Sequence, residues 1–148
     1  MIFNRNLTKY WIPAILWMGF IYWMSTDTFS SENTFSCVET LLRFWVPKIS
    51  FQEMVSLNAL IRKAAHVTEY FVFGLLLFRM FRGSSVSSWN WRWPILAVIA
   101  VALWAASDEF HQSFVPSRTA SAADVAIDTA GGILAQFVAF LWHRGRKK

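Results

Sequence analysis

The sequence has 148 residues, of which 55% are hydrophobic and 16% charged, with nine Trp, fourteen Phe and a formal charge of +5. Its mean hydropathy of +0.36 is high for a soluble protein of this size. Lys and Arg gather at the ends of apolar segments rather than in a polar basic stripe, which argues against nucleic-acid binding and favours a membrane protein. Cys37 is the only cysteine, so an intrachain disulfide is excluded. The length fits one domain covering residues 1–148.

The first apolar segment predicts a transmembrane helix over residues 9–25. Its core from Tyr10 to Met24 reads YWIPAILWMGFIYWM, slightly short against the ~20 residues that a span needs. A cleaved signal peptide is the alternative, but bulky Trp23 and Met24 precede Ser25 without a small-x-small cleavage pattern. We therefore expect a retained first span.

Residues 25–62 form the longest polar connection, and an apolar pattern at helical spacing runs through it until Pro47. The residues of this pattern are Phe35, Val38, Leu41, Leu42 and Trp45. We expect an amphipathic helix at the membrane surface, with packing against the bundle as the open alternative. Ser50 and Glu53 fit a capping box that begins the next helix.

The second predicted span covers residues 64–81 and carries polar side chains in its first half. Lys63 and His66 are three residues apart and Glu69 follows one turn later, so the three share a helical face. Tyr70 lies four residues after His66 and borders the same face. A lone His on such a face is usually a satisfied core residue, whereas a His one turn from a Glu indicates a site more strongly.

The third predicted span, 94–110, is apolar until its last turn, which contains Asp108 and Glu109. Gln112 follows Asp108 by four residues, so the two share a face if the helix continues. Ionisable side chains cost about 2.5–3.5 kcal/mol each in a membrane and therefore indicate function. A solvated loop between two spans is the structural alternative.

The fourth predicted span covers residues 122–142 and begins with Asp124 and Asp128 in its first two turns. A helix N-terminus favours negative charge at these positions. Gly131 and Gly132 continue the same stripe, and their small size allows a neighbouring helix to approach closely.

Four spans place both termini on one side of the membrane. Nine Lys and Arg residues lie on the side of the termini and of residues 79–93, against five on the other side. The positive-inside rule therefore predicts cytoplasmic termini. In this topology the polar ends of the second, third and fourth spans all meet at the extracytoplasmic end.

These expectations describe an all-α integral membrane protein, a four-transmembrane-helix bundle with an amphipathic helix in its extracytoplasmic loop. The catalytic candidates are His66, Asp108 and Glu109. The candidate ligand-binding residues are Lys63, Glu69, Tyr70, Gln112, Arg118, Asp124 and Asp128. Neighbouring carboxylates raise one another's pKa, which provides a general acid, while Arg118 can hold an anionic group. We predict no metal, because His66-x-x-Glu69 alone is a weak metal signature, and no cofactor.

The order of these polar residues resembles the VanZ-like family of bacterial membrane proteins. The residues that carry the resemblance are Lys63-x-x-His66-x-x-Glu69-Tyr70, Asp108-Glu109-x-x-Gln112, Arg118 and Asp124, with Ser25 after the first span. The resemblance implies a multi-helix protein of the bacterial plasma membrane, and the family's namesake is associated with resistance to the glycopeptide antibiotic teicoplanin. Family members often have Pro-Gly-Arg where this chain has Pro-Ser-Arg at 116–118, and often Asn in place of Asp128.

Three functions fit these features. The first is an enzyme that acts on a membrane lipid, a cell-wall precursor or an amphipathic antibiotic at the outer membrane–water boundary. The second is a noncatalytic protein that binds and sequesters such a ligand. The third is a small transporter subunit, although polar residues at only one end provide no continuous path.

Overall fold

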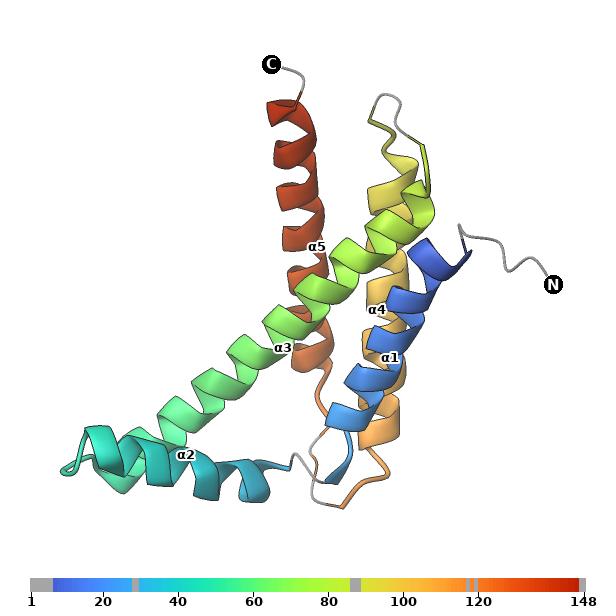
Figure 1. The fold of residues 1–148 in the computed structure, drawn as a ribbon. Coiled ribbons are helices and arrows are strands. Elements are labelled where there is room, and N and C mark those ends of the chain that lie inside the picture. Colours follow the sequence, from blue (N-terminus) through green and yellow to red (C-terminus); the bar gives the residue numbers. More distant parts are fainter. Residues whose placement is uncertain (1–6, 28–29, 86–88, 117, 119, 147–148) are drawn as a thin grey trace.

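The computed structural model describes residues 7–27, 30–85, 89–116, 118 and 120–146, and within these ranges all regular structure is helical. A π-helical segment, η1, precedes five α-helices (Figure 1). The elements are η1 (Leu7–Trp11), α1 (Ile12–Met24), α2 (Ser31–Trp45), α3 (Phe51–Arg82), α4 (Arg92–Gln112) and α5 (Ala122–Gly145).

Three helices, α3, α4 and α5, are long and apolar enough to cross a membrane. The helix α1 has only 13 residues, with Pro13 in its first turn, and η1 extends it at the N-terminus. At 1.5 Å per residue α1 is about 20 Å long, shorter than the ~30 Å hydrocarbon core. The expected all-helical fold is therefore confirmed for the described residues, with three helices that could span a membrane, and the expected count of four spans is not.

The helices expected between residues 25 and 62 are present. Ser50 caps α3, since its hydroxyl accepts a hydrogen bond from the Glu53 amide (3.3 Å) while the Glu53 carboxylate accepts one from the Ser50 amide (2.9 Å). This confirms the predicted capping box. Helix α3 then runs unbroken into the predicted span, and α2 lies across its N-terminal half (Figure 1). Phe44 and Trp45 of α2 are each 76% exposed, which suits the predicted surface helix without placing it in a membrane.

Small residues bring α3, α4 and α5 together. A Cβ atom on Gly131 of α5 would lie 2.6 Å from the Val67 carbonyl oxygen of α3. A Cβ atom on Gly132 would lie 2.7 Å from Val101 of α4. The two adjacent glycines thus let α5 pack closely against both neighbouring helices, as the small-residue stripe indicated.

This packing sets which helix ends meet. The C-terminal ends of α1 and α4 and the N-terminal end of α5 lie at the same end of the molecule, where the middle of α3 passes them (Figure 1). The polar residues of the three long helices therefore come together, as the hydropathy pattern predicted.

Candidate functional site

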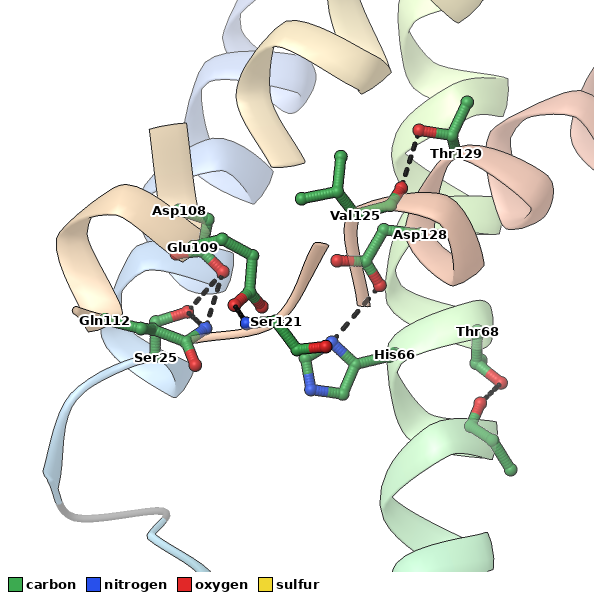
Figure 2. A network of polar contacts seen from close by, with 11 residues as sticks. Ser25, His66, Thr68, Asp108, Glu109, Gln112, Ser121, Val125, Asp128 and Thr129 are labelled. Carbon is green, nitrogen blue, oxygen red and sulfur yellow. Dashed lines mark hydrogen bonds and ion pairs between the residues drawn. The ribbon is translucent and has the colours of Figure 1, made fainter. Parts of the chain in front are cut away.

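Asp108 is the centre of a buried hydrogen-bonded group at the end of α1 and α4 (Figure 2). Its Oδ2 accepts one hydrogen bond from the Ser25 hydroxyl (2.7 Å) and one from Gln112 Nε2 (3.0 Å). Asp108 and Gln112 meet because they are one turn apart on α4, as their spacing predicted. Ser25 is the C-cap residue of α1, so the group joins two helices.

Glu109, the next residue, connects α4 to the start of α5. Its Oε2 accepts a hydrogen bond from the backbone amide of Ser121 (2.7 Å). Ser121 is the N-cap of α5, and its hydroxyl accepts the amide of Ala123 (3.1 Å). Glu109 therefore holds the N-terminus of α5 against α4. Its carboxyl group positions this helix and does not line the pocket.

His66 of α3 pairs with Asp128 of α5 across 3.2 Å between Nδ1 and Oδ1 (Figure 2). The Asp128 side chain is fully buried, whereas His66 is partly exposed. A carboxylate that accepts the Nδ1–H fixes the imidazole tautomer and leaves Nε2 as the proton-accepting nitrogen. The pair thus has the geometry of a His oriented for acid–base chemistry.

Each of these three carboxyls keeps one buried oxygen without a hydrogen-bond partner in the described part of the chain. These oxygens are Asp108 Oδ1, Glu109 Oε1 and Asp128 Oδ2. The buried hydroxyl of Tyr70 also has no hydrogen-bond partner among the described residues. Leaving a buried polar group unpaired costs about 1–3 kcal/mol, so each of these atoms requires a proton, an ordered water molecule or another polar partner.

Arg118 braces the main chain around Ser25. Its Nη2 donates hydrogen bonds to the carbonyl oxygens of Met24 and Thr26, the residues on either side of Ser25. Burial lowers the pKa of the Arg118 guanidinium from its ordinary value, and the nearby Arg62 guanidinium lowers it further. Arg118 therefore fixes the end of α1 and contributes a partly desolvated positive charge.

A cavity of about 90 Å³ is lined by the ends of α1 and α4, by α2 and α3, and by the connection before α5. Its polar lining comprises Ser25, Arg62, His66, Glu69, Gln112 and Arg118, among others. Four of the predicted site residues therefore share this pocket: His66, Glu69, Gln112 and Arg118.

The other predicted residues lie elsewhere. Asp108, Glu109, Asp128 and Tyr70 are buried outside the pocket lining. Asp124 is half-buried in the first turn of α5, and Lys63 is exposed and outside the lining. Within the described residues, no group of three His, Cys, Asp or Glu side chains is placed to hold a metal ion.

Five described lining residues were not among the predicted site residues, and Ser25 and Arg62 are the two of these that bear on the chemistry of the pocket. Ser25 was noted only through the family pattern, and Arg62 only as one of the charges that set the orientation. Arg62 could have been found from helical spacing, since it precedes His66 by one turn and Glu69 by two.

Comparison with protein families identifies the chain. Residues 10–143 match the sequence model of the VanZ/LLP1 family. The chain belongs to the VanZ/LLP1 family. Comparisons with curated proteins and with solved structures gave no match. The matched range contains every element from α1 to α4 and nearly all of α5, so the pocket of this VanZ/LLP1 protein lies within the family region.

Proposed function

We propose that this VanZ/LLP1 protein acts on a lipid, a lipid-linked cell-wall precursor or an amphipathic antibiotic at the outer surface of the bacterial plasma membrane. The observation that carries the proposal is the lining of one pocket by His66, which buried Asp128 orients, and by Arg118. The pocket lies at the end where apolar helices meet, so an amphipathic ligand can place its polar group there and keep its apolar part in lipid.

The proposal includes a single membrane domain with four spans and both termini cytoplasmic. Together, η1 and α1 form a continuous helical segment from Leu7 to Met24. At about 1.5 Å per residue this segment is slightly shorter than the hydrocarbon core is thick. Tight packing or local thinning of the bilayer compensates for the difference in length. The site then lies on the extracytoplasmic side, as the distribution of Lys and Arg favours.

In the catalytic form of this proposal, His66 exchanges a proton with the ligand through Nε2 while Arg118 stabilises its anionic group. Asp128 fixes the tautomer and the ring orientation of His66. Asp108 acts indirectly, since its hydrogen bonds position Ser25 and Gln112 in the pocket lining. Glu109 positions α5 through Ser121.

A noncatalytic binding protein is the second candidate. The hydrogen bonds of Asp108 and Glu109 favour this candidate. One carboxylate oxygen of each residue accepts a hydrogen bond that holds two helix ends together. In this form the protein reduces the access of an antibiotic or precursor to the membrane surface, and no bond is broken.

The test compares envelope lipids and added teicoplanin, by mass spectrometry, from cells that express the wild type or His66→Asn at equal membrane abundance. An enzyme yields a product that the variant does not form, although the variant still binds ligand. Sequestration yields no product, and protection then falls in proportion to affinity. The absence of both a product and ligand binding would contradict the proposal.

A further inference from the structure

Two arginine residues from distant parts of the chain line the pocket. Arg62 comes from α3 and Arg118 from the connection before α5, and both line the same cavity. The ion pairs within the described residues are Arg43–Glu39 and His66–Asp128, so neither pocket arginine is paired with a carboxylate there. Arg118 instead contacts two main-chain carbonyl groups, which carry no formal charge.

Two like charges in one half-buried pocket repel each other and lose hydration, so they favour an anion between them. Burial and the Arg62 guanidinium lower the pKa of Arg118, while the carboxyl groups of Asp108, Glu69 and Asp27 act on it in the opposite direction. Glu69 is the one carboxyl group among the described lining residues. A proton shared between Glu69 and an anionic oxygen of the ligand relieves their repulsion.

The size of the pocket restricts the group that enters it. About 90 Å³ holds a few water molecules or a group of a few heavy atoms, so a whole glycopeptide does not fit. A carboxylate carries one charge and is satisfied by a single bidentate arginine. A phosphate monoester carries about −1.5 to −2 at neutral pH and has three acceptor oxygens, which matches two arginines.

The surroundings of the site favour a ligand that remains in the membrane. Phe110 and Phe114, at the end of α4 that supplies Gln112 to the pocket, are 69% and 70% exposed. Tyr22 and Trp23, immediately before the pocket residues of α1, are about half exposed. Large apolar side chains around a small cationic pocket suit a lipid whose headgroup enters while its chains stay outside.

We infer that the pocket binds the terminal phosphate monoester of a membrane lipid, with Arg62 and Arg118 as paired anchors. This inference deepens the proposed function by naming the ligand class of the same site. It also gives Arg62 a role in binding that Lys63, one residue later on an exposed face of α3, does not share.

The test uses the full-length protein purified in detergent and measures dissociation constants by calorimetry. The probes are dihexanoyl phosphatidic acid, which is a phosphate monoester, dihexanoyl phosphatidylglycerol, which is a diester, and inorganic phosphate. We expect the monoester lipid to bind at least about tenfold more tightly than either other probe. Arg62→Gln should weaken its binding by about tenfold or more, and Arg62→Lys by less, because Lys keeps the charge without the bidentate geometry. Arg92→Gln, at the opposite end of α4, is the matched control and should bind like the wild type.

Three results would overturn the inference. Equal affinity for the monoester and diester lipids would exclude recognition of a terminal phosphate. Equal affinity for inorganic phosphate would exclude a lipid as the source of the anion. Unchanged binding by both Arg62 variants would exclude the paired anchors, and Arg62→Lys keeps this test valid if Arg62→Gln fails to fold.

The outcome is independent of activity in cells. Selective phosphate binding in a protein that neither modifies nor protects the envelope would contradict the proposed function and support the inference. Protection that persists when the purified protein shows no phosphate preference would support the proposed function and overturn the inference.

Discussion

The Nδ1 atom of His66 lies 3.2 Å from Oδ1 of Asp128, which joins the middle of α3 to the first turns of α5 beside the pocket. Asp128 is fully buried, so this carboxyl group meets the pocket only through His66. This contact gives Asp128 a role in orienting His66. Many VanZ-like sequences have Asn at this position. Asn retains an acceptor for the Nδ1–H and removes the negative charge.

The first prediction separates these two properties of Asp128. We expect Asp128→Asn to remain folded, because the amide oxygen still accepts the hydrogen bond from His66. Asp128→Ala leaves the imidazole unpaired and opens a small void, so it should lower the free energy of unfolding by about 1–3 kcal/mol. Denaturant unfolding of the purified variants in detergent measures the free energy of unfolding of each variant.

Functional data on the same variants then show whether the charge is needed. If Asp128 only fixes the tautomer, Asp128→Asn retains protection or product formation, whereas Asp128→Ala loses it. Equal stability of the two variants would contradict the hydrogen bond as a contribution to folding.

The second prediction concerns the link between Ser25 and Asp108. Their hydrogen bond is buried and 2.7 Å long, so we expect Ser25→Ala and Asp108→Ala to be coupled. A double-mutant cycle of unfolding free energies should give an interaction energy of about 0.5–3 kcal/mol. Ser113→Ala serves as the control partner for Asp108→Ala, because Ser113 is exposed and its hydroxyl donates to the Phe110 carbonyl oxygen. Additive effects of Ser25→Ala and Asp108→Ala would show that the contact contributes nothing.

The third prediction tests the close packing of α5. Gly131→Ala should destabilise the protein by about 1–3 kcal/mol, because its Cβ would clash with the Val67 carbonyl oxygen, which belongs to rigid helix backbone. Gly145→Ala is the matched control, since no atom lies within 4 Å of its Cβ position. The control should be neutral or slightly stabilising, because Ala favours a helix over Gly. A stable Gly131→Ala variant would mean that α3 and α5 lie farther apart.

The fourth prediction tests whether α1 crosses the membrane. Cys37→Ser removes the only cysteine, and single cysteines then replace Lys9, Lys48 or Asn90. With an impermeant maleimide applied to intact cells, we expect labelling at position 48 alone, and labelling at 9 and 90 after permeabilisation. Labelling of position 9 in intact cells, with 90 still protected, would show that α1 does not span the bilayer.

The sequence indicated the end of the molecule where the pocket lies, but not which side chains line it. Hydropathy shows where the apolar segments end, and so it predicted that the polar residues of the second, third and fourth spans would lie at one end of the bundle. The capping box and the Asp108–Gln112 contact are local, so spacing along the chain was sufficient.

The remaining features depend on tertiary packing. The rotation of α3 decides that Arg62 lines the pocket while Lys63 is exposed, and two adjacent basic residues give no indication of that rotation. The contact between Ser25 and Asp108 spans 83 positions, so no local pattern reveals it. The short α1 with a π-helical segment before it also differs from the regular span expected over residues 9–25.

We propose that the pocket between α3 and the C-terminal ends of α1 and α4 is the functional site. The most direct measurement is teicoplanin susceptibility of a sensitive Gram-positive host that carries an empty vector, the wild type, Glu109→Gln or Arg118→Ala at matched membrane abundance. We expect the wild type to protect and Arg118→Ala to fail, because the variant loses both the brace on Ser25 and the pocket charge. Glu109→Gln keeps an acceptor for the Ser121 amide, so a loss of protection there would show that the carboxyl charge itself is required. Protection by Arg118→Ala equal to that of the wild type would contradict the claim.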